Sequence, residues 1–207
     1  MAPLLPRERP MRHSLTDVIA LAALLLWPAI PLFWVPVHCV PRFFRRLGFF
    51  TYVLPLITWL PVALLTFEFR EILLSHRTAL PAAAKFIGGL LFISGAGLQA
   101  WTLILLTLPV IMGMPEVTRS MPGRLVTRGP FALVRHPTYL SHTLMLLGLF
   151  LWTGVTALGI VTLIDAFAVN VMVIPLEERE LSERFGKEYE EYCQKVPSRF
   201  LPLRRPR

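Results

Sequence analysis

The chain has 207 residues, of which 55% are hydrophobic and only 16% are charged, and its mean hydropathy is +0.59. This composition excludes an ordinary soluble domain and indicates an integral membrane protein. The net charge of +8 does not indicate nucleic-acid binding, because the basic residues flank apolar runs, as membrane orientation requires. We therefore expect no nucleic-acid partner, and one membrane domain over residues 1–207, with spans in residues 1–114 and a functional core in residues 115–207.

Five apolar segments predict an all-α fold with about five transmembrane helices. They cover residues 18–40, 49–67, 86–112, 140–152 and 155–176. The first contains Pro28, Pro31 and Pro36, which predict a kink or an irregular turn. The fourth is short for a crossing by itself, and Thr153 and Gly154 permit a tight turn after it. The last two segments are therefore expected to form a helical hairpin.

The segment after the last span has the pattern of an amphipathic helix. Apolar and aromatic residues recur there at three- to four-residue spacing, namely Leu181, Phe185, Tyr189, Tyr192 and Val196. Glu180 and Arg184 form a favourable i,i+4 pair on this helix. Pro197 is expected to end it.

The basic residues predict how the chain is oriented in the membrane. Of the 21 Lys and Arg, 15 lie in the segments after the first and third spans and in the tail. With five spans these three segments share one side, so the positive-inside rule puts them and the C-terminus in the cytoplasm and the N-terminus outside. If the first segment is re-entrant, the N-terminus lies inside as well. Cys39 and Cys193 then both lie near the cytoplasm, where no disulfide is expected, and neither has a partner at metal-ligand spacing.

Several polar residues lie within the predicted spans. A carboxylate in the bilayer costs about 3 kcal/mol on insertion scales, so Asp165 is expected to face the bundle interior. Asn170 and Glu177 are seven residues apart, which places them within roughly 20° of each other on a regular helix. Gln99 is expected to make an interhelical hydrogen bond. The pattern leaves open whether His142 is functional or structural.

Residues 125–139, LVTRGPFALVRHPTY, concentrate polar chemistry between two spans. Pro137 disfavours helix at His136 and fits the first turn of a following helix. The imidazole is therefore expected at a helix N-terminus, where free backbone N–H groups favour anions. The alternative is that Arg135 and His136 simply contact lipid phosphates.

This segment and the tail, EERELSERFGKEYEEYCQKVPSRFLP, together resemble the isoprenylcysteine carboxyl methyltransferase family and its bacterial relatives. The shared features are Arg-His-Pro-x-Tyr, Glu-Glu-x-x-Leu, Phe-Gly and Tyr-x-x-Tyr, in that order. The resemblance implies a multi-pass membrane methyltransferase that uses S-adenosyl-L-methionine at the cytoplasmic face. Its acceptor would be lipophilic or small: an isoprenylcysteine-like carboxylate, a thiol or an amine lipid.

The resemblance also implies cofactor contacts in both blocks. Carried onto this sequence, they are Gly123, Arg124, Leu125, Val126, Phe131, His136, Pro137, Thr138, Tyr139 and Glu177. The residue types suit the cofactor, because Glu177 can bind a ribose diol or a cationic group. His136 can meet a carboxylate, and aromatic rings can pack against the base.

Four polar residues could take part in the chemistry itself. Arg135 is placed to hold an anionic acceptor, whereas Glu178 or Asp165 can hold an ammonium group or take its proton. Asn170 joins them as a member of the polar stripe that leads to Glu177. The candidate catalytic set is therefore Arg135, Glu178 and Asn170.

The sequence departs from the family pattern at positions that bear on the substrate. Phe131 replaces a usual tyrosine, Ser141 replaces a glycine, and Val173 stands where the eukaryotic enzymes place a substrate-binding arginine. The acceptor is therefore open, as is the oligomeric state. Membrane sterol reductases share Arg-His-Pro-x-Tyr and bind a nicotinamide cofactor, but usually carry asparagine at the position of Thr138 and Gly-Glu in place of Ser141 and His142. A non-catalytic lipid-binding protein is the third possibility.

Overall fold

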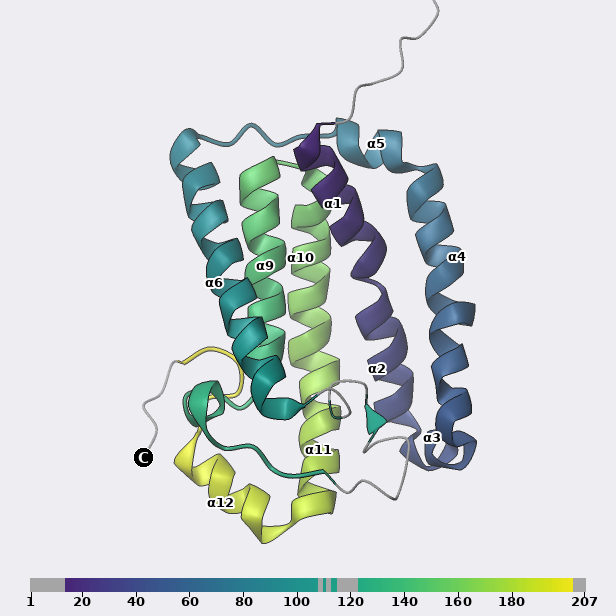
Figure 1. The fold of residues 1–207 in the computed structure, drawn as a ribbon, viewed down its shortest axis with the longest axis vertical. Coiled ribbons are helices and arrows are strands. Elements are labelled where there is room, and N and C mark those ends of the chain that lie inside the picture. Colours follow the sequence, from purple (N-terminus) through teal and green to yellow (C-terminus); the bar gives the residue numbers. More distant parts are fainter. Residues whose placement is uncertain (1–13, 108–109, 111–112, 115–122, 203–207) are drawn as a thin grey trace, which may run out of the picture.

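The computed structural model describes residues 14–107, 110, 113–114 and 123–202, and these form a bundle of long helices that run up and down between two ends (Figure 1). The described helices are α1 (Leu15–Leu26), α2 (Ala29–Cys39), α3 (Pro41–Leu47), η1 (Gly48–Val53), α4 (Leu54–Glu68), α5 (Arg70–Ser75), α6 (Ala82–Leu106), η2 (Gly129–Ala132), α9 (Pro137–Thr153), α10 (Thr156–Ala168), η3 (Val169–Val173), α11 (Ile174–Phe185) and α12 (Lys187–Lys195). No strand occurs among the described residues.

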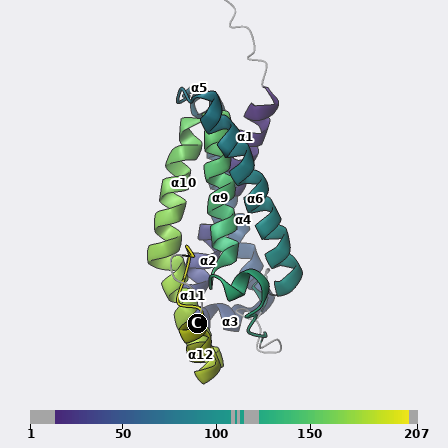
Figure 2. The same ribbon diagram turned by 90° about the vertical axis from the view of Figure 1, so that its left-hand side faces the viewer.

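Four helical stretches are long and apolar enough to cross a bilayer. They are Leu15–Cys39, Pro41–Glu68, Ala82–Leu106 and Thr156–Phe185. Helix α9 has 17 residues, the lower limit for a crossing, and runs between α6 and α10 through the bundle (Figures 1 and 2). The all-α integral membrane fold is thus confirmed, and the last two crossings form the expected hairpin.

The expected irregularity of the first span lies at Trp27 and Pro28, between α1 and α2. Pro28 cannot donate a backbone N–H, and α1 ends just before it. The indole Nε1 of Trp59 donates to the carbonyl of Leu25 at 2.6 Å, so α4 satisfies a backbone group beside the break. The segment then continues as α2 to the opposite end of the bundle (Figure 1), so it does not re-enter.

Glycines let α6 and α9 approach closely. A Cβ atom on Gly88 would lie 2.6 Å from the backbone nitrogen of Trp152, and one on Gly148 would lie 2.6 Å from that of Phe92. A Cβ atom on Gly95 would lie 2.8 Å from the carbonyl oxygen of Ser141. This contact fixes α9 against α6 at the depth where α9 carries its polar side chains.

The turn between α9 and α10 lies at the end of the bundle opposite to the tail. Gly154 has φ 71°, as a tight turn after Thr153 requires, and its carbonyl accepts a bond from the N–H of Thr78 at 2.8 Å. Arg77 donates to the carbonyl of Thr153 at 2.9 Å and pairs with Asp17 at the start of α1. The hairpin is thereby anchored to the first span.

Three predicted boundaries were wrong. Helix α6 ends at Leu106, where Thr107 adopts φ 67°, rather than near residue 112. The helix of the fifth span does not end at residue 176, because it continues without a break to Phe185. The tail is therefore two helices, α11 and α12, which separate at Gly186 with φ 53° and ψ −124°.

Candidate functional site

A single turn of π-helix, Val169–Val173, sets the direction of Glu177. A π turn holds one residue more than an α turn, so every side chain beyond it is rotated by roughly 100° relative to a regular helix. Glu177 consequently does not share a face with Asn170, which is exposed and whose Nδ2 donates to the carbonyl of Ala166 at 2.8 Å. The expected stripe from Asn170 to Glu177 was wrong, since only Glu177 reaches the site.

The Arg-His-Pro segment is built as its sequence predicts. Pro137 is the first residue of α9, and His136 caps it with φ −122° and ψ 59°, outside the helical region. The side chain of His136 is 3% exposed and is directed into the protein. Its ring stacks on that of Tyr139 with centroids 5.9 Å apart.

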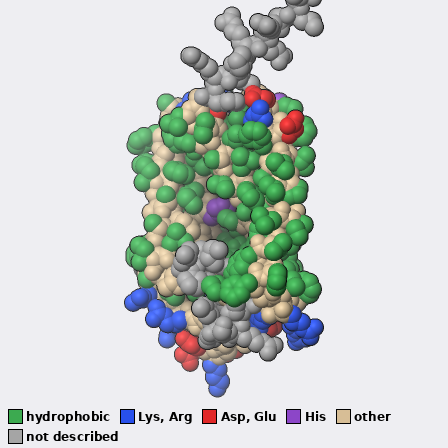
Figure 3. All heavy atoms as spheres, turned by 45° about the vertical axis from the view of Figure 1, so that its right-hand side comes forward, with side chains coloured by type: hydrophobic (Ala, Val, Ile, Leu, Met, Phe, Trp, Pro, Cys, Tyr) green, Lys and Arg blue, Asp and Glu red, His purple; other side chains and the backbone are tan. Residues whose placement is uncertain are grey.

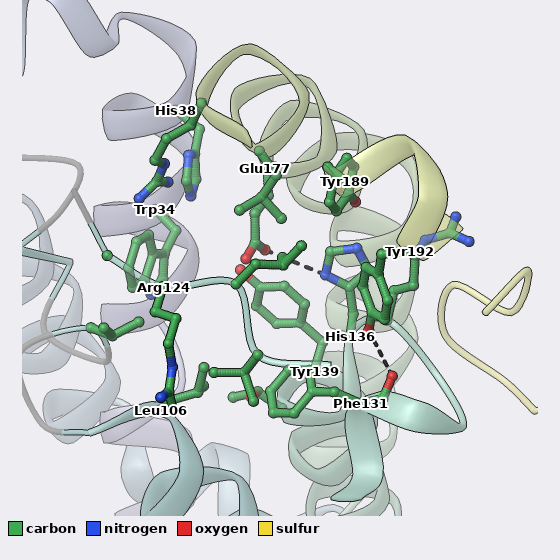
Figure 4. Close-up of a pocket in the computed structure, with 18 of the residues that line it drawn as sticks. Trp34, His38, Leu106, Arg124, Phe131, His136, Tyr139, Glu177, Tyr189 and Tyr192 are labelled. Atoms are coloured by element: carbon green, nitrogen blue, oxygen red, sulfur yellow. Dashed lines mark hydrogen bonds and ion pairs between the residues drawn. The ribbon is translucent and has the colours of Figure 1, made fainter. Parts of the chain in front are cut away.

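The tail folds back onto this segment, so the two sequence blocks meet. The backbone N–H groups of Arg135 and His136 donate to the carbonyls of Ser198 and Arg199, both at 2.9 Å. Tyr192 of α12 donates its hydroxyl to the carbonyl of Phe131 at 2.7 Å (Figure 4). Burial raises the pKa of Tyr192, which keeps this hydroxyl protonated.

Glu178 is held by three cationic side chains. Arg135 Nη2 and Arg199 Nε lie 2.8 and 2.9 Å from its carboxylate oxygens, and His136 Nε2 lies at 3.3 Å. Arg135 also donates to the carbonyl of Val196 at 2.7 Å. Since the Arg135 and Glu178 side chains are 7% and 11% exposed, this is a buried clamp that fastens the segment before α9 to α11 and to the residues that follow α12.

Glu177 has different surroundings. Its Oε2 lies 3.5 Å from His136 Nδ1, too long for a good hydrogen bond, and has no hydrogen-bond partner among the described residues. The hydroxyl of Tyr139 points toward this carboxylate (Figure 4). Burial alone would lower the pKa of His136, but the neighbouring carboxylates of Glu177 and Glu178 raise it above its ordinary value of 6.5. The imidazole is therefore a cation between two carboxylates, not a free ligand for an anion.

These groups surround a cavity of about 470 Å³, within the usual size range of small-molecule sites. It is lined by α2, α6, α9, α11, α12 and the segment before α9 (Figure 4). The lining residues are Ile30, Trp34, His38, Gln99, Leu106, Val110, Gly123, Arg124, Leu125, Val126, Phe131, Arg135, His136, Thr138, Tyr139, His142, Met145, Glu177, Leu181, Arg184, Phe185, Tyr189 and Tyr192.

Nearly all of the residues expected at the cofactor lie on this cavity. They are Gly123, Arg124, Leu125, Val126, Phe131, His136, Thr138, Tyr139 and Glu177. Pro137 is buried behind the lining as the first residue of α9. Of the candidate catalytic residues, Arg135 reaches the cavity wall, Glu178 lies in the clamp and Asn170 lies outside.

Two cavity residues with ring side chains come from the first span and were not expected from the sequence. Trp34 and His38 are one turn apart on α2, and their rings stack at 5.2 Å. His38 Nδ1 bonds Glu180 at 2.8 Å, and Glu180 also binds Arg45 at 2.9 Å and Arg184 at 3.5 Å. The Glu180–Arg184 pair was expected, but the link to the first span was not. The available signal was a histidine within an apolar segment, which indicates a buried partner.

A buried donor in the cavity wall has no internal partner. The hydroxyl of Thr138 is inaccessible to solvent and makes no hydrogen bond within the described part of the chain. A buried hydroxyl is normally satisfied, so Thr138 Oγ1 and Glu177 Oε2 are two polar atoms suited to a polar ligand. Together with the aromatic rings of Phe131, Tyr139 and Trp34, they form a donor and acceptor set that fits a nucleoside with charged substituents.

The cavity extends into the membrane-embedded part of the bundle. Gln99 of α6 accepts a hydrogen bond from Ser141 of α9, which confirms its interhelical role. Asp165 faces the interior as expected, with 2% exposure. Figure 3 shows an apolar belt between two charged ends, and a recess in this belt in which a histidine side chain is visible. The fold and site together define an integral membrane protein with a largely apolar pocket that carries a few polar groups and extends from one end of the bundle to its apolar belt.

Comparisons with known proteins agree with this class. Residues 83–188 match the family model for phospholipid methyltransferases, which covers half of the chain. The chain therefore belongs to the phospholipid methyltransferase family. The matched region contains α6, the Arg-His-Pro segment, the hairpin, α11 and the start of α12.

Individual relatives match shorter stretches of the chain. Protein-S-isoprenylcysteine O-methyltransferase B of Arabidopsis thaliana is 34% identical over 90 residues, which are 40% of this chain and 42% of that protein. Cobalt-zinc-cadmium resistance protein CzcN of Cupriavidus metallidurans is 40% identical over 82 residues, 38% of this chain and 36% of that protein. Delta(14)-sterol reductase TM7SF2 of Mus musculus is 28% identical over 95 residues, 45% of this chain and 23% of that protein. The alignments thus span less than half of each relative, and no solved structure matches the chain significantly.

Proposed function

We propose that this protein is a membrane methyltransferase that uses S-adenosyl-L-methionine and acts on a lipophilic acceptor. The observation that carries the proposal is the single cavity on which both sequence blocks converge, with Glu177 on one wall and His136, Thr138 and Tyr139 on the other. Family membership and the relative named as an isoprenylcysteine O-methyltransferase support the same reaction class.

The membrane-face end of the cavity would hold the cofactor. Glu177 has an unused carboxylate oxygen for a hydroxyl or ammonium group, and Thr138 has an unused hydroxyl. Arg124, beside the end of α6 in Figure 4, provides a cation for a carboxylate. Bound there, S-adenosyl-L-methionine would supply a methyl group on a positively charged sulfur. The protein would contribute orientation and exclusion of water, since the walls around this end are largely apolar and aromatic.

Arg135 and Glu178 would act on structure instead of on the acceptor. Each is held in the clamp by charged hydrogen bonds, so neither offers a free group to a substrate. We infer that the clamp keeps α12 closed over the cavity, because Tyr189 and Tyr192 of that helix form part of its wall.

The acceptor would enter from the bilayer and the cofactor from the cytoplasm. The recess in the apolar belt of Figure 3 supports lateral entry. We assign the site to the cytoplasmic side from the distribution of basic residues. Of the 21 Lys and Arg, 15 lie in the segments after the first and third spans and in the tail, which are all at this end of the bundle. Labelling of Cys193 by an impermeant thiol reagent only after cells are opened is the expected result, and labelling in intact cells would contradict it.

Calorimetry on the detergent-purified protein tests the cofactor. S-adenosylhomocysteine, the demethylated product, should bind, and NADPH should not. A protein that binds NADPH and ignores S-adenosylhomocysteine would be the reductase suggested by the similarity to the mouse sterol reductase. Binding of neither would favour a non-catalytic lipid-binding role.

A further inference from the structure

A second polar cluster lies deeper in the bundle than Glu177, around the carboxylate of Asp165. Asp165 Oδ1 accepts from the indole Nε1 of Trp27 at 2.8 Å, and Oδ2 lies 3.3 Å from Thr143 Oγ1 and 3.5 Å from His142 Nδ1. Only 2% of the Asp165 side chain is exposed. A buried acid within a span is costly and marks a functional site by default.

His142 connects this cluster to the cavity. Tyr139, His142 and Met145 all line the cavity and are spaced three residues apart, so they form one face of α9. His142 is 16% exposed, whereas the other two cavity histidines, His38 and His136, are 2% and 3% exposed. Nδ1 lies within ion-pair distance of Asp165 but makes no hydrogen bond to a described residue, so Nε2 is the nitrogen left for the cavity.

The arrangement is that of a histidine base oriented by a buried carboxylate. Asp165 is close enough, at 3.5 Å, to favour a proton on Nδ1 electrostatically and to stabilise the imidazolium that would form when Nε2 accepts a proton. Three residues separate Tyr139 from His142, a rise of about 4.5 Å along α9. The base is therefore one turn deeper in the membrane than the end of the cavity that we assign to the cofactor.

We propose that His142 is the general base of the methyl transfer and that Asp165 positions it, which rests on the proposed function. The acceptor would be a lipophilic molecule with a protic nitrogen or sulfur nucleophile. A neutral amine or a thiol would use its lone pair to form the bond to the methyl carbon, the carbon–sulfur bond would break with its electron pair staying on sulfur, and the acceptor's proton would pass to His142 Nε2. Atoms and charge balance without a further reactant.

The same cluster disfavours a carboxylate acceptor. A carboxylate is already ionised at neutral pH and needs no base, and the negative charge of Asp165 repels it in a poorly screened interior. Val173 is apolar and 2% exposed where a cation would be needed. Arg124 is too far away to supply that cation. It lies near Leu106 in Figure 4, and Leu106 is about 10 Å along α6 from Gln99. Gln99 is at the depth of His142, because it is hydrogen-bonded to the neighbouring Ser141.

Three acceptors that differ only in their reactive group test the substrate class. Purified protein is given methyl-labelled S-adenosyl-L-methionine with decylamine, decanethiol or decanoic acid, and methylated products are measured by mass spectrometry. Methylation of the amine or the thiol, with none of the acid, is the expected result. Methylation of the acid alone would overturn the inference, and so would absence of transfer to the amine and thiol by a protein that binds S-adenosylhomocysteine.

Variants separate catalysis from structure. His142→Asn should lower the transfer rate by about 100- to 10,000-fold, as loss of a general base does, while S-adenosylhomocysteine affinity stays unchanged. Trp27→Phe removes the 2.8 Å bond to Asp165 without touching His142, so it should lower thermal stability and keep most of the transfer rate. His76→Asn, at the opposite end of the bundle, is the matched control for losing a histidine.

A binding measurement gives a readout independent of turnover. In the presence of S-adenosylhomocysteine, Asp165→Asn should weaken decylamine binding at least tenfold and strengthen decanoic acid binding. Equal loss of transfer in Trp27→Phe and His142→Asn, or unchanged selectivity in Asp165→Asn, would show that the cluster is only structural. If S-adenosylhomocysteine itself does not bind the wild-type protein, the proposed function fails first, and this inference fails with it.

Discussion

Glu177 and Glu178 are adjacent in sequence but lie in different surroundings. Glu178 is enclosed by Arg135, Arg199 and His136, with both oxygens within 3.3 Å of a cationic nitrogen. Glu177 has one cationic neighbour at 3.5 Å and lines the cavity. Successive residues of a helix point about 100° apart, so one carboxylate enters the clamp and the other enters the pocket.

The comparison shows that two adjacent acidic residues of one motif can have different roles, one in stability and one in ligand binding. An acid with saturated partners stabilises the fold, because its charge is already neutralised and its lone pairs are occupied. An acid with an unused oxygen in a cavity retains binding capacity for a ligand. The predictions below test this division between Glu178 and Glu177.

The largest effect is expected from breaking the clamp. Arg135→Ala should destabilise the protein by about 3–5 kcal/mol, because it leaves a buried carboxylate without its nearest partner. Thermal and denaturant unfolding in detergent measure this loss. Arg179→Ala is the control, since the Arg179–Glu183 pair is 80% and 67% exposed and should contribute nothing measurable. Equal stability of the two variants would contradict the clamp.

Glu177→Gln should affect the ligand more than the fold. Loss of one charged hydrogen bond in a desolvated pocket should weaken S-adenosylhomocysteine binding by roughly ten- to a hundredfold, with a small change in melting temperature. Glu183→Gln on the exposed face of α11 controls for charge alone. If the melting temperature falls while the affinity per folded molecule stays the same, Glu177 has a structural role like that of Glu178 and does not bind the ligand.

The pH dependence of stability tests the cation between the two acids. His136 has a pKa raised above its ordinary 6.5, so protonation stabilises the folded state most fully below that value. This stabilisation should be lost as the pH rises from 6.5 through the raised pKa. His136→Asn should be less stable than the wild type at about pH 6, and the difference should shrink toward about pH 9 in denaturant titrations. A pH-independent difference would mean that His136 is neutral.

The smallest effect is expected at the contact between α12 and the segment before α9. Tyr192→Phe removes the 2.7 Å bond to the carbonyl of Phe131 and keeps the ring in place. The loss should be about 1 kcal/mol, as for a typical buried hydrogen bond. Hydrogen exchange in α12 should quicken while S-adenosylhomocysteine still binds. Loss of binding as large as in Glu177→Gln would place Tyr192 with the ligand contacts.

Much of the architecture was predictable because a bilayer imposes strong rules. Apolar length defined the crossings, proline defined the break at Pro28, and glycine defined the turn at Gly154. The residues expected at the cofactor, in the segment before α9, at the start of α9 and at Glu177, were identified through the motif resemblance, and the structure brings nearly all of them onto one cavity. Asp165 faced inward, as the cost of a buried charge requires.

What could not be predicted depends on geometry over long sequence distances. His38 and Glu180 are 142 residues apart, so no spacing rule relates them. The division between Glu177 and Glu178 depends on which face of α11 meets Arg135, and that face is set by the π turn. The periodicity of the tail continued through Gly186, so the pattern alone concealed the break between α11 and α12.

The π turn at Val169–Val173 has a consequence for how this helix tolerates change in length. Removing one residue there would restore regular α-helix and leave the hydropathy profile of the span almost untouched. Yet everything beyond it would be turned by roughly 100° and drawn back by about 1.5 Å. Asp165 would stay in its place while Glu177 left the cavity. The five-residue segment thus fixes the angle around the helix axis between Asp165 and Glu177. A deletion that leaves the composition of the span almost unchanged would therefore point the two acids in directions that no longer serve one cavity.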